Sequence, residues 1–316
     1  MTSAARTITS ADPGSDRYRE AERSLWHHYG LEPNQRFVEV SSPAVRLRVV
    51  EVGSGPPVLF IPGTAGTGPY WGSLVRALGG YRCLMVDRPG WGLSAPLDYT
   101  GIDYGTVVAD LLRGLLDTLE IEKADVVGSS IGDLWALRLA SRRPARVGRV
   151  VLLGGGPIVA DSGIPGIIRL IASPIGAIML WLPPKPARVK ALMRRAGHGA
   201  SLDAGLIPDE YVRWRVAFER ETDSMRNERA MVRSIVSWRT GLRTGIAFED
   251  AELAAIQQPT LLVFGTADPV GTVATWRQVV DRLPRGALQL VDGAGHVPWL
   301  DDPTSVAGHI SRFLAT

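Results

Sequence analysis

The 316-residue sequence has little cysteine and little lysine. Its single cysteine, Cys83, lies in the apolar run 83–86, which excludes an internal disulfide and a metal site built on several cysteines and indicates an inert buried thiol. Only three of the 35 basic residues are lysine, and the arginines are spread along the chain among acidic residues. A net charge of +3 without a basic tail or zinc-finger spacing argues against nucleic-acid binding.

Long hydrophobic runs are also missing. Residues 1–20 are polar and lack the apolar core of a signal peptide. The most apolar stretch, residues 164–182, is nearly long enough to span a bilayer, but Arg169, Pro174 and Gly176 interrupt it. These features predict a cytoplasmic protein with no stable membrane insertion, and they leave its oligomeric state open.

The leading part of the chain predicts a tail, a helix and a hairpin. Residues 1–15 have the composition of a loose tail, and residues 18–29 have a helical pattern. Residues 36–40 and 45–49 alternate between apolar and polar side chains, which is typical of half-buried strands. We expect residues 1–34 to form an N-terminal tail and helix ahead of the main domain.

The pattern then changes to short apolar runs separated by helical stripes. Such runs are typical of strands buried on both faces of a parallel sheet. They lie at 58–61, 83–86, 126–127, 150–153, 261–264 and 288–291. The alternation predicts an α/β fold with a mostly parallel central sheet and helices on both faces. Strand signals disappear between the fourth and fifth runs, so we interpret residues 158–250 as an inserted helical cap and residues 35–157 and 251–316 as the core.

The clearest chemical motif is Gly128-Ser129-Ser130-Ile131-Gly132. It follows the predicted strand 124–127 and precedes a helix that starts near Asp133. A serine on a sharp strand-to-helix turn needs small neighbours, and Gly128 and Gly132 let the backbones approach closely. The turn would present the hydroxyl of Ser130 at the carboxyl end of the sheet.

A serine hydroxyl needs a nearby base, and the base needs an orienting acid. Asp268 and His296 each follow a predicted strand, so both fall at the edge where an open α/β sheet builds its site. We therefore predict a triad of Ser130, Asp268 and His296. Asp87 is a rival acid, but it follows a strand on the far side of the elbow strand and is interpreted as a structural loop residue. The other histidines, His198 among them, have no surroundings typical of a site.

Four motifs together resemble the α/β-hydrolase superfamily, in its serine-nucleophile branch with a cap domain. They are Pro62-Gly63-Thr64-Ala65, the segment 87–94 (DRPGWGLS), the Ser130 elbow, and Gly295-His296 followed by Asp302-Pro303. The resemblance covers residues 35–316 and implies an α/β-hydrolase fold.

The resemblance also implies an oxyanion hole. Its donors would be the backbone amides of Ile131 and Thr64, with Ala65 the less favoured choice for the second. The chain departs from the family at Pro62, where His is common, and at Asp133, where a small residue is usual. The helix dipole favours an acid at position 133, and contact with the cap or the substrate is the alternative.

The expected function is a serine hydrolase that cleaves a carboxylic ester of an apolar, small-to-medium substrate through an acyl-enzyme on Ser130. No metal and no cofactor is required. We expect the substrate pocket to be lined by a set of small and apolar side chains, although the same side chains would also suit simple packing of the cap. The set is Ala65, Ile168, Ile171, Met179 and Trp181.

Three alternatives stay open at this point. The first is hydrolysis of a carbon–carbon bond in a diketone-like acid, where a cap arginine would bind the acidic group. The basic run formed by Arg188, Lys190, Arg194 and Arg195 is either such a site or a solvated helix face. The second is cofactor-free perhydrolysis, and the third is a non-catalytic ligand-binding protein on the same fold.

Overall fold

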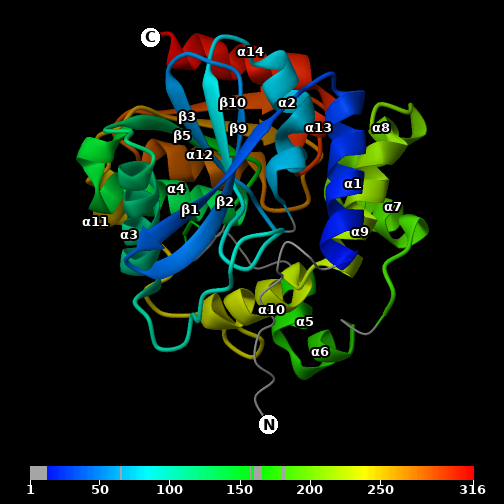
Figure 1. Cartoon of the computed structure of the whole chain (residues 1–316). Helices are drawn as coiled ribbons and strands as arrows, with labels where there is room; N and C mark the ends of the chain where they lie inside the picture. Colours follow the sequence, from blue (N-terminus) through cyan, green and yellow to red (C-terminus); the bar gives the residue numbers. More distant parts are fainter. Residues whose placement is uncertain (1–12, 65, 157, 160–165, 180–181) are drawn as a thin grey trace.

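A computed structural model describes residues 13–64, 66–156, 158–159, 166–179 and 182–316 (Figure 1). Its centre is an eight-stranded sheet in the order β1-β2-β4-β3-β5-β6-β9-β10. β2 pairs antiparallel with β1 and β4, and the other neighbours pair in parallel. The strands are β1 (Asn34–Ser41), β2 (Ala44–Val52), β3 (Pro57–Ile61), β4 (Arg82–Val86), β5 (Ala124–Ser129), β6 (Val147–Leu153), β9 (Thr260–Gly265) and β10 (Gly286–Val291).

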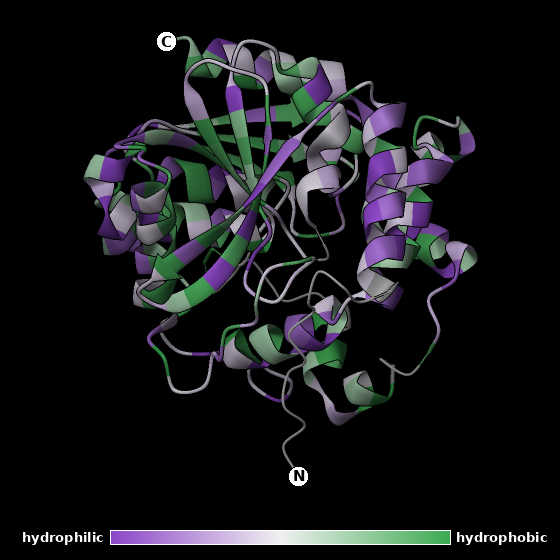
Figure 2. Ribbon diagram, in the orientation of Figure 1, coloured by the Kyte–Doolittle hydropathy of each residue, from purple (hydrophilic) through white to green (hydrophobic). Residues whose placement is uncertain are grey.

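The predicted mostly parallel sheet is confirmed, and each predicted apolar run lies within one of its strands. The central strands are buried on both faces, which is why their sequences are continuously apolar rather than alternating. Figure 2 shows these strands as largely hydrophobic. Cys83 is buried in β4, as expected, and burial raises the pKa of its thiol to about 12.

Helices cover both faces of the sheet, as predicted. α2 (Gly72–Ala77) packs against α14 (Pro303–Leu314), and α3 (Tyr104–Thr118) packs against α4 (Ile131–Arg142) on the opposite face (Figure 1). Asp302 caps α14 by accepting a hydrogen bond of 2.9 Å from the Ser305 amide. The remaining core helices are η1 (Gly68–Trp71), η2 (Pro144–Arg146), α11 (Asp250–Ala254), α12 (Val273–Asp281) and α13 (Pro298–Asp301).

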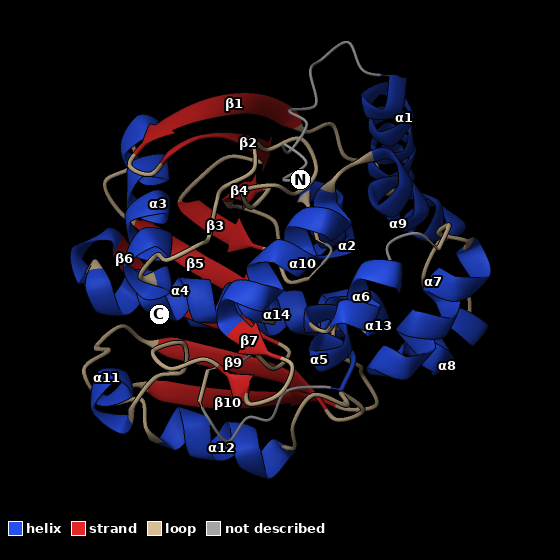
Figure 3. Cartoon of the chain, turned by 90° about the horizontal axis from the view of Figure 1, so that it is seen from below, coloured by secondary structure: helices blue, strands red, loops and turns tan. Residues whose placement is uncertain are grey.

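A helical insertion lies between β6 and α11. Its described elements are α5 (Gly166–Ala172), α6 (Pro174–Met179), α7 (Pro186–Met193), η4 (Arg194–His198), α8 (Gly199–Asp203), α9 (Asp209–Glu221), α10 (Ser224–Ile235) and the hairpin of β7 (Val236–Ser237) and β8 (Gly241–Leu242). Figures 1 and 3 show α5, α6 and α10 grouped together and α9 beside α1 (Pro13–His28).

The apolar stretch 164–182 is only partly buried in its described residues. Ile175, Ile178 and Leu182 are 59%, 66% and 55% exposed. α5 ends at Ala172 and the separate short helix α6 begins at Pro174, so Ile175 and Ile178 belong to a different helix from Ile168 and Ile171. Among the described residues, no helix is long and apolar enough to cross a membrane.

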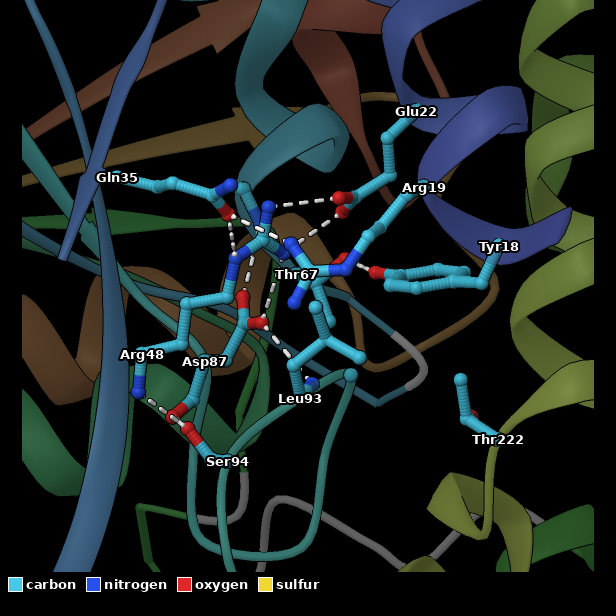
Figure 4. A network of polar contacts seen from close by, with 12 residues as sticks. Tyr18, Arg19, Glu22, Gln35, Arg48, Thr67, Asp87, Leu93, Ser94 and Thr222 are labelled. Atoms are coloured by element: carbon cyan, nitrogen blue, oxygen red, sulfur yellow. Dashed lines mark hydrogen bonds and ion pairs between the residues drawn. The ribbon is translucent and has the colours of Figure 1, made fainter. Parts of the chain in front are cut away.

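Helix α1 is fixed to the core by a buried polar network (Figure 4). Glu22 of α1 accepts two hydrogen bonds from the guanidinium of Arg48 in β2, at 2.7 and 2.9 Å. Asp87, after β4, lies 3.3 Å from the same guanidinium and accepts a hydrogen bond of 3.1 Å from the Gly68 amide. Tyr18 adds a hydroxyl contact of 2.7 Å to Thr67. These contacts support the interpretation of Asp87 as a structural residue.

Candidate active site

The turn between β5 and α4 has the geometry that its two glycines suggest. Ser130 has φ 54° and ψ −117°, a conformation that non-glycine residues rarely adopt. Strained backbone conformations of this kind cluster at functional sites. A Cβ at Gly132 would lie 2.0 Å from the Ile61 carbonyl oxygen, and one at Gly128 would lie 2.5 Å from that of Gly132. Ser130 is the N-cap residue of α4, but its hydroxyl accepts no hydrogen bond from a backbone amide of the helix, so it does not act as a side-chain cap.

The predicted base and acid lie in contact. His296 Nδ1 is 2.9 Å from Asp268 Oδ2. The other oxygen of Asp268 accepts a hydrogen bond of 2.7 Å from the Val270 amide. Because the Asp268 side chain is also fully buried, its carboxylate is fixed in place. The His296 side chain is 18% exposed. This arrangement orients the imidazole and leaves Nε2 as the ring nitrogen available to a serine hydroxyl.

One cavity of about 540 Å³ brings the predicted residues together. Ser130 and His296 line it, and Thr64 and Ile131, the predicted oxyanion donors, lie on its wall. The helical insertion supplies much of the remaining lining, which is mainly apolar. The insertion therefore covers the carboxyl ends of the strands, where the elbow lies.

The five predicted substrate-contacting residues have different outcomes. Ile168 and Ile171 line the cavity. Ala65 and Trp181 lie outside the described residues, and Met179 ends α6 but its side chain is also outside the description. Sequence reasoning missed several residues of α9 and α10 that line the cavity, among them Tyr211, Arg215 and Glu228. No motif marks them, because their place in the site depends on how the insertion folds over the sheet.

Asp133 differs from the simplest expectation for an acid in a first helical turn. It lies in the first turn of α4 but is fully buried, and one carboxyl oxygen accepts a hydrogen bond of 3.2 Å from the Leu153 amide. The other oxygen has no hydrogen-bond partner in the described structure. Burial, together with the nearby charge of Asp268, raises the pKa of Asp133 well above its usual range. This burial favours the neutral form of the carboxyl group beside the elbow.

His198 also differs from the expectation, because it does have site-like surroundings. It lines the cavity, and its Nδ1 lies 2.8 Å from Asp301 Oδ2. Both side chains are buried, at 2% and 9% exposure. The arginine-rich sequence around His198 gives no sign of this pairing.

The fold and the elbow turn at Ser130 are those of the α/β-hydrolase class, and the comparisons with known proteins agree with this class. The family model of the alpha/beta hydrolase fold matches residues 56–303. The chain belongs to this family. Within the described residues, no group of three potential metal ligands is found.

Two relatives in sequence show what the chain is similar to. It is 28% identical over 298 residues to 2-hydroxy-6-oxononadienedioate/2-hydroxy-6-oxononatrienedioate hydrolase 2 of Pseudomonas putida, which covers 92% of this chain and 93% of the relative. It is 27% identical over 292 residues to an uncharacterized protein of Mycobacterium tuberculosis, with 88% and 83% covered.

The naproxen esterase of Bacillus subtilis has a similar fold, with a TM-score of 0.67 at 19% identity over 97% of this chain and 100% of that one. A meta-cleavage product hydrolase of Pseudomonas fluorescens reaches a TM-score of 0.71 at 23% identity, with 89% and 97% covered.

Proposed function

We propose that the protein is a serine hydrolase that works by acyl transfer, with Ser130 as nucleophile, His296 as base and Asp268 as the acid that orients His296. The hydroxyl oxygen attacks a carbonyl carbon while His296 takes its proton, and the same proton then passes to the leaving group. Water repeats the sequence on the acyl-enzyme and frees Ser130. The contact of 2.9 Å between Asp268 and His296, and the cavity that His296 and Ser130 both line, carry this proposal.

The oxyanion of the tetrahedral intermediate would form between the amides of Ile131 and Thr64. Ile131 is the first residue of α4, so its N–H is free of helix hydrogen bonding and lies at the positive end of the helix dipole. Each such donor is worth about 10²–10³ in rate. Both residues lie on the cavity wall, which supports the assignment.

The first substrate class is an apolar carboxylic ester. The cavity wall from the insertion is formed by side chains such as Ile168, Ile171, Val189, Met193 and Val232. An apolar wall with a few convergent polar groups is the usual form of a small-molecule site, and it favours acyl or alcohol groups of similar character. The relationship to esterases in fold is consistent with this choice.

Carbon–carbon bond hydrolysis of a diketone-like acid is the second candidate, and a specific observation favours it. In the basic run, Lys190 and Arg194 pair with exposed aspartates. Arg188 and Arg195 instead line the cavity, and among the described residues neither pairs with a carboxylate. Two arginines at the wall of an apolar cavity suit a substrate carboxylate, although Arg188 also donates a hydrogen bond of 3.3 Å to the Leu182 carbonyl. The Pseudomonas putida relative is a hydrolase of such dioic acids by name.

The experiment has two arms. A fluorophosphonate probe should label the wild-type protein and Ser129→Ala but not Ser130→Ala. Ser129 is the matched control, since it is the neighbouring serine and its hydroxyl contacts Tyr70 at 3.0 Å. Labelling of Ser130→Ala at the wild-type rate would contradict the proposed nucleophile. A folded wild-type protein that is not labelled would favour a binding protein.

The second arm compares nitrophenyl esters of graded acyl length with a 2-hydroxy-6-oxo-dienoic acid. Ester turnover that rises with acyl length supports the first substrate class. Preferred turnover of the dienoic acid, lost in Arg188→Leu or Arg195→Leu, supports the second. A folded protein that is labelled but turns over neither would show that both substrate classes are wrong.

A further inference from the structure

The backbone around His296 is held by hydrogen bonds to residues outside its own loop. The Gly295 amide donates a hydrogen bond of 2.8 Å to Asp301 Oδ2. The His296 amide donates one of 2.8 Å to the Ala196 carbonyl, and the Val297 amide donates one of 3.3 Å to His198 Nε2. Three consecutive amides, centred on the base, are therefore fixed by the segment Arg194–His198 and by α13.

The contacts define the protonation of His198. Because the Val297 N–H points at Nε2, that nitrogen accepts, and Nδ1 must carry the proton that it donates to Asp301 at 2.8 Å. The second oxygen of Asp301 accepts a hydrogen bond of 2.5 Å from the Ser201 hydroxyl. His198 is thus a neutral imidazole that links the insertion to the loop of the catalytic histidine.

The same segment is built to approach that loop closely. Gly197 has φ 94°, and a Cβ there would lie 2.5 Å from the Ala267 carbonyl oxygen and 2.7 Å from Gly295 Cα. A side chain at this position is excluded both by conformation and by space. Ala267 precedes the triad acid, so this turn of the insertion packs between the loops that carry Asp268 and His296.

We propose that His198, held by Asp301, is a positioning residue for His296. The segment Arg194–His198 also lines the cavity through Arg195, Ala196 and His198. One segment of the insertion therefore contacts the space for substrate and fixes the orientation of the base. This inference rests on the proposed function, because it needs His296 to act as the base.

Two substitutions separate the hydrogen bonds of His198. In His198→Asn, the amide nitrogen takes the place of Nδ1 and still reaches Asp301, but nothing accepts from Val297. In His198→Gln, the amide oxygen lies near the place of Nε2 and keeps the contact with Val297. Ser201→Ala is the matched control, because it removes a hydrogen bond to Asp301 that does not reach the His296 loop.

The rate of fluorophosphonate labelling reports on how well the base is positioned, and it does not require the natural substrate to bind. Labelling forms the bond from Ser130 Oγ to phosphorus and expels fluoride, while the serine proton passes to His296. We expect His198→Asn to slow labelling about tenfold, the size of one lost hydrogen bond, and to lower kcat by a similar factor with KM nearly unchanged. His198→Gln and Ser201→Ala should stay within about threefold of the wild type, since both keep the Val297 contact.

The outcomes separate this inference from the function on which it rests. Equal labelling rates for His198→Asn and His198→Gln, in folded proteins, would overturn it, and so would an equal loss in Ser201→Ala. A change confined to KM would also overturn it, because it would mean that His198 only shapes the cavity. Undiminished labelling of His296→Ala would overturn both proposals. If His296→Ala is not labelled but His198→Asn is labelled at the wild-type rate, only the present inference is overturned.

Discussion

Replacing Glu22 by alanine removes the carboxylate that joins α1 to the sheet. Glu22 makes a bidentate pair with Arg48, and the two side chains are only 3% and 5% exposed. Removing one partner of a buried ion pair leaves an uncompensated charge and typically costs about 3–5 kcal/mol. The loss should therefore be far larger than that of an exposed pair, which is about 0–1 kcal/mol.

We expect the loss of unfolding free energy in Glu22→Ala to lie at the lower end of that range, because Asp87 can partly replace Glu22 as the partner of Arg48. Burial and then the charge of Glu22 raise the pKa of Asp87 to about 6, against the opposing effect of Arg48. Without Glu22, Asp87 ionises more readily and takes over part of the pairing with Arg48 across 3.3 Å. We expect a loss of about 3 kcal/mol in the free energy of unfolding. At about 2.1 cal/mol/K of unfolding entropy per residue, this is a fall in Tm of about 4–5 °C.

Urea and thermal unfolding of Glu22→Ala and Glu20→Ala form the assay. Glu20 lies on the same helix, and its contact with Arg23 is exposed, so helix propensity and charge change alike in both variants. Because the network lies outside the proposed active site, turnover at 25 °C should be retained by both proteins. Equal losses in the two variants, or a loss for Glu22→Ala below about 1 kcal/mol, would refute the reasoning.

Two further predictions concern the site. Asp133→Asn replaces a carboxyl whose pKa is raised by burial. The stability contributed by the neutral form is fully present below the pKa of an unfolded aspartate, about 3.9, and is lost as pH rises through the raised folded pKa. In urea titrations the variant should therefore gain stability relative to the wild type as pH rises above about 3.9. A difference that does not change with pH would contradict this. Ile171→Arg should raise KM for long-chain esters at least about tenfold, because it places a charge in the apolar wall of the cavity. Ile175→Arg, at a position that is 59% exposed, should leave KM unchanged. Equal KM values for the two variants would show that α5 does not contact the substrate.

The sequence predicts the sheet well because its signals are local. Each buried strand is a short apolar run, and the elbow is marked by Gly128 and Gly132, whose lack of a Cβ is required within the same turn. Asp268 and His296 could be proposed because each follows a strand of known direction. Their contact then follows from the parallel pairing of β9 and β10.

The rest depends on contacts between segments far apart in the chain. His198 and Asp301 are 103 residues apart, and Glu22 and Arg48 belong to different elements, so no periodicity or spacing connects them. Arg48 lies in a strand whose neighbours alternate, and the pattern alone assigns it to the solvent side. Its burial is decided by α1 lying over that side, which periodicity within a single strand does not show.

The anchoring of α1 has a consequence for where the folding unit begins. The part shared with the family model starts at residue 56, after α1, β1 and β2. A fragment cut at that boundary would hold Ser130, Asp268 and His296, yet it would turn β4 from an inner strand into an edge and leave Asp87 buried without Arg48. We therefore expect the folding unit to be larger than the part that the family model matches, and to include α1, β1 and β2.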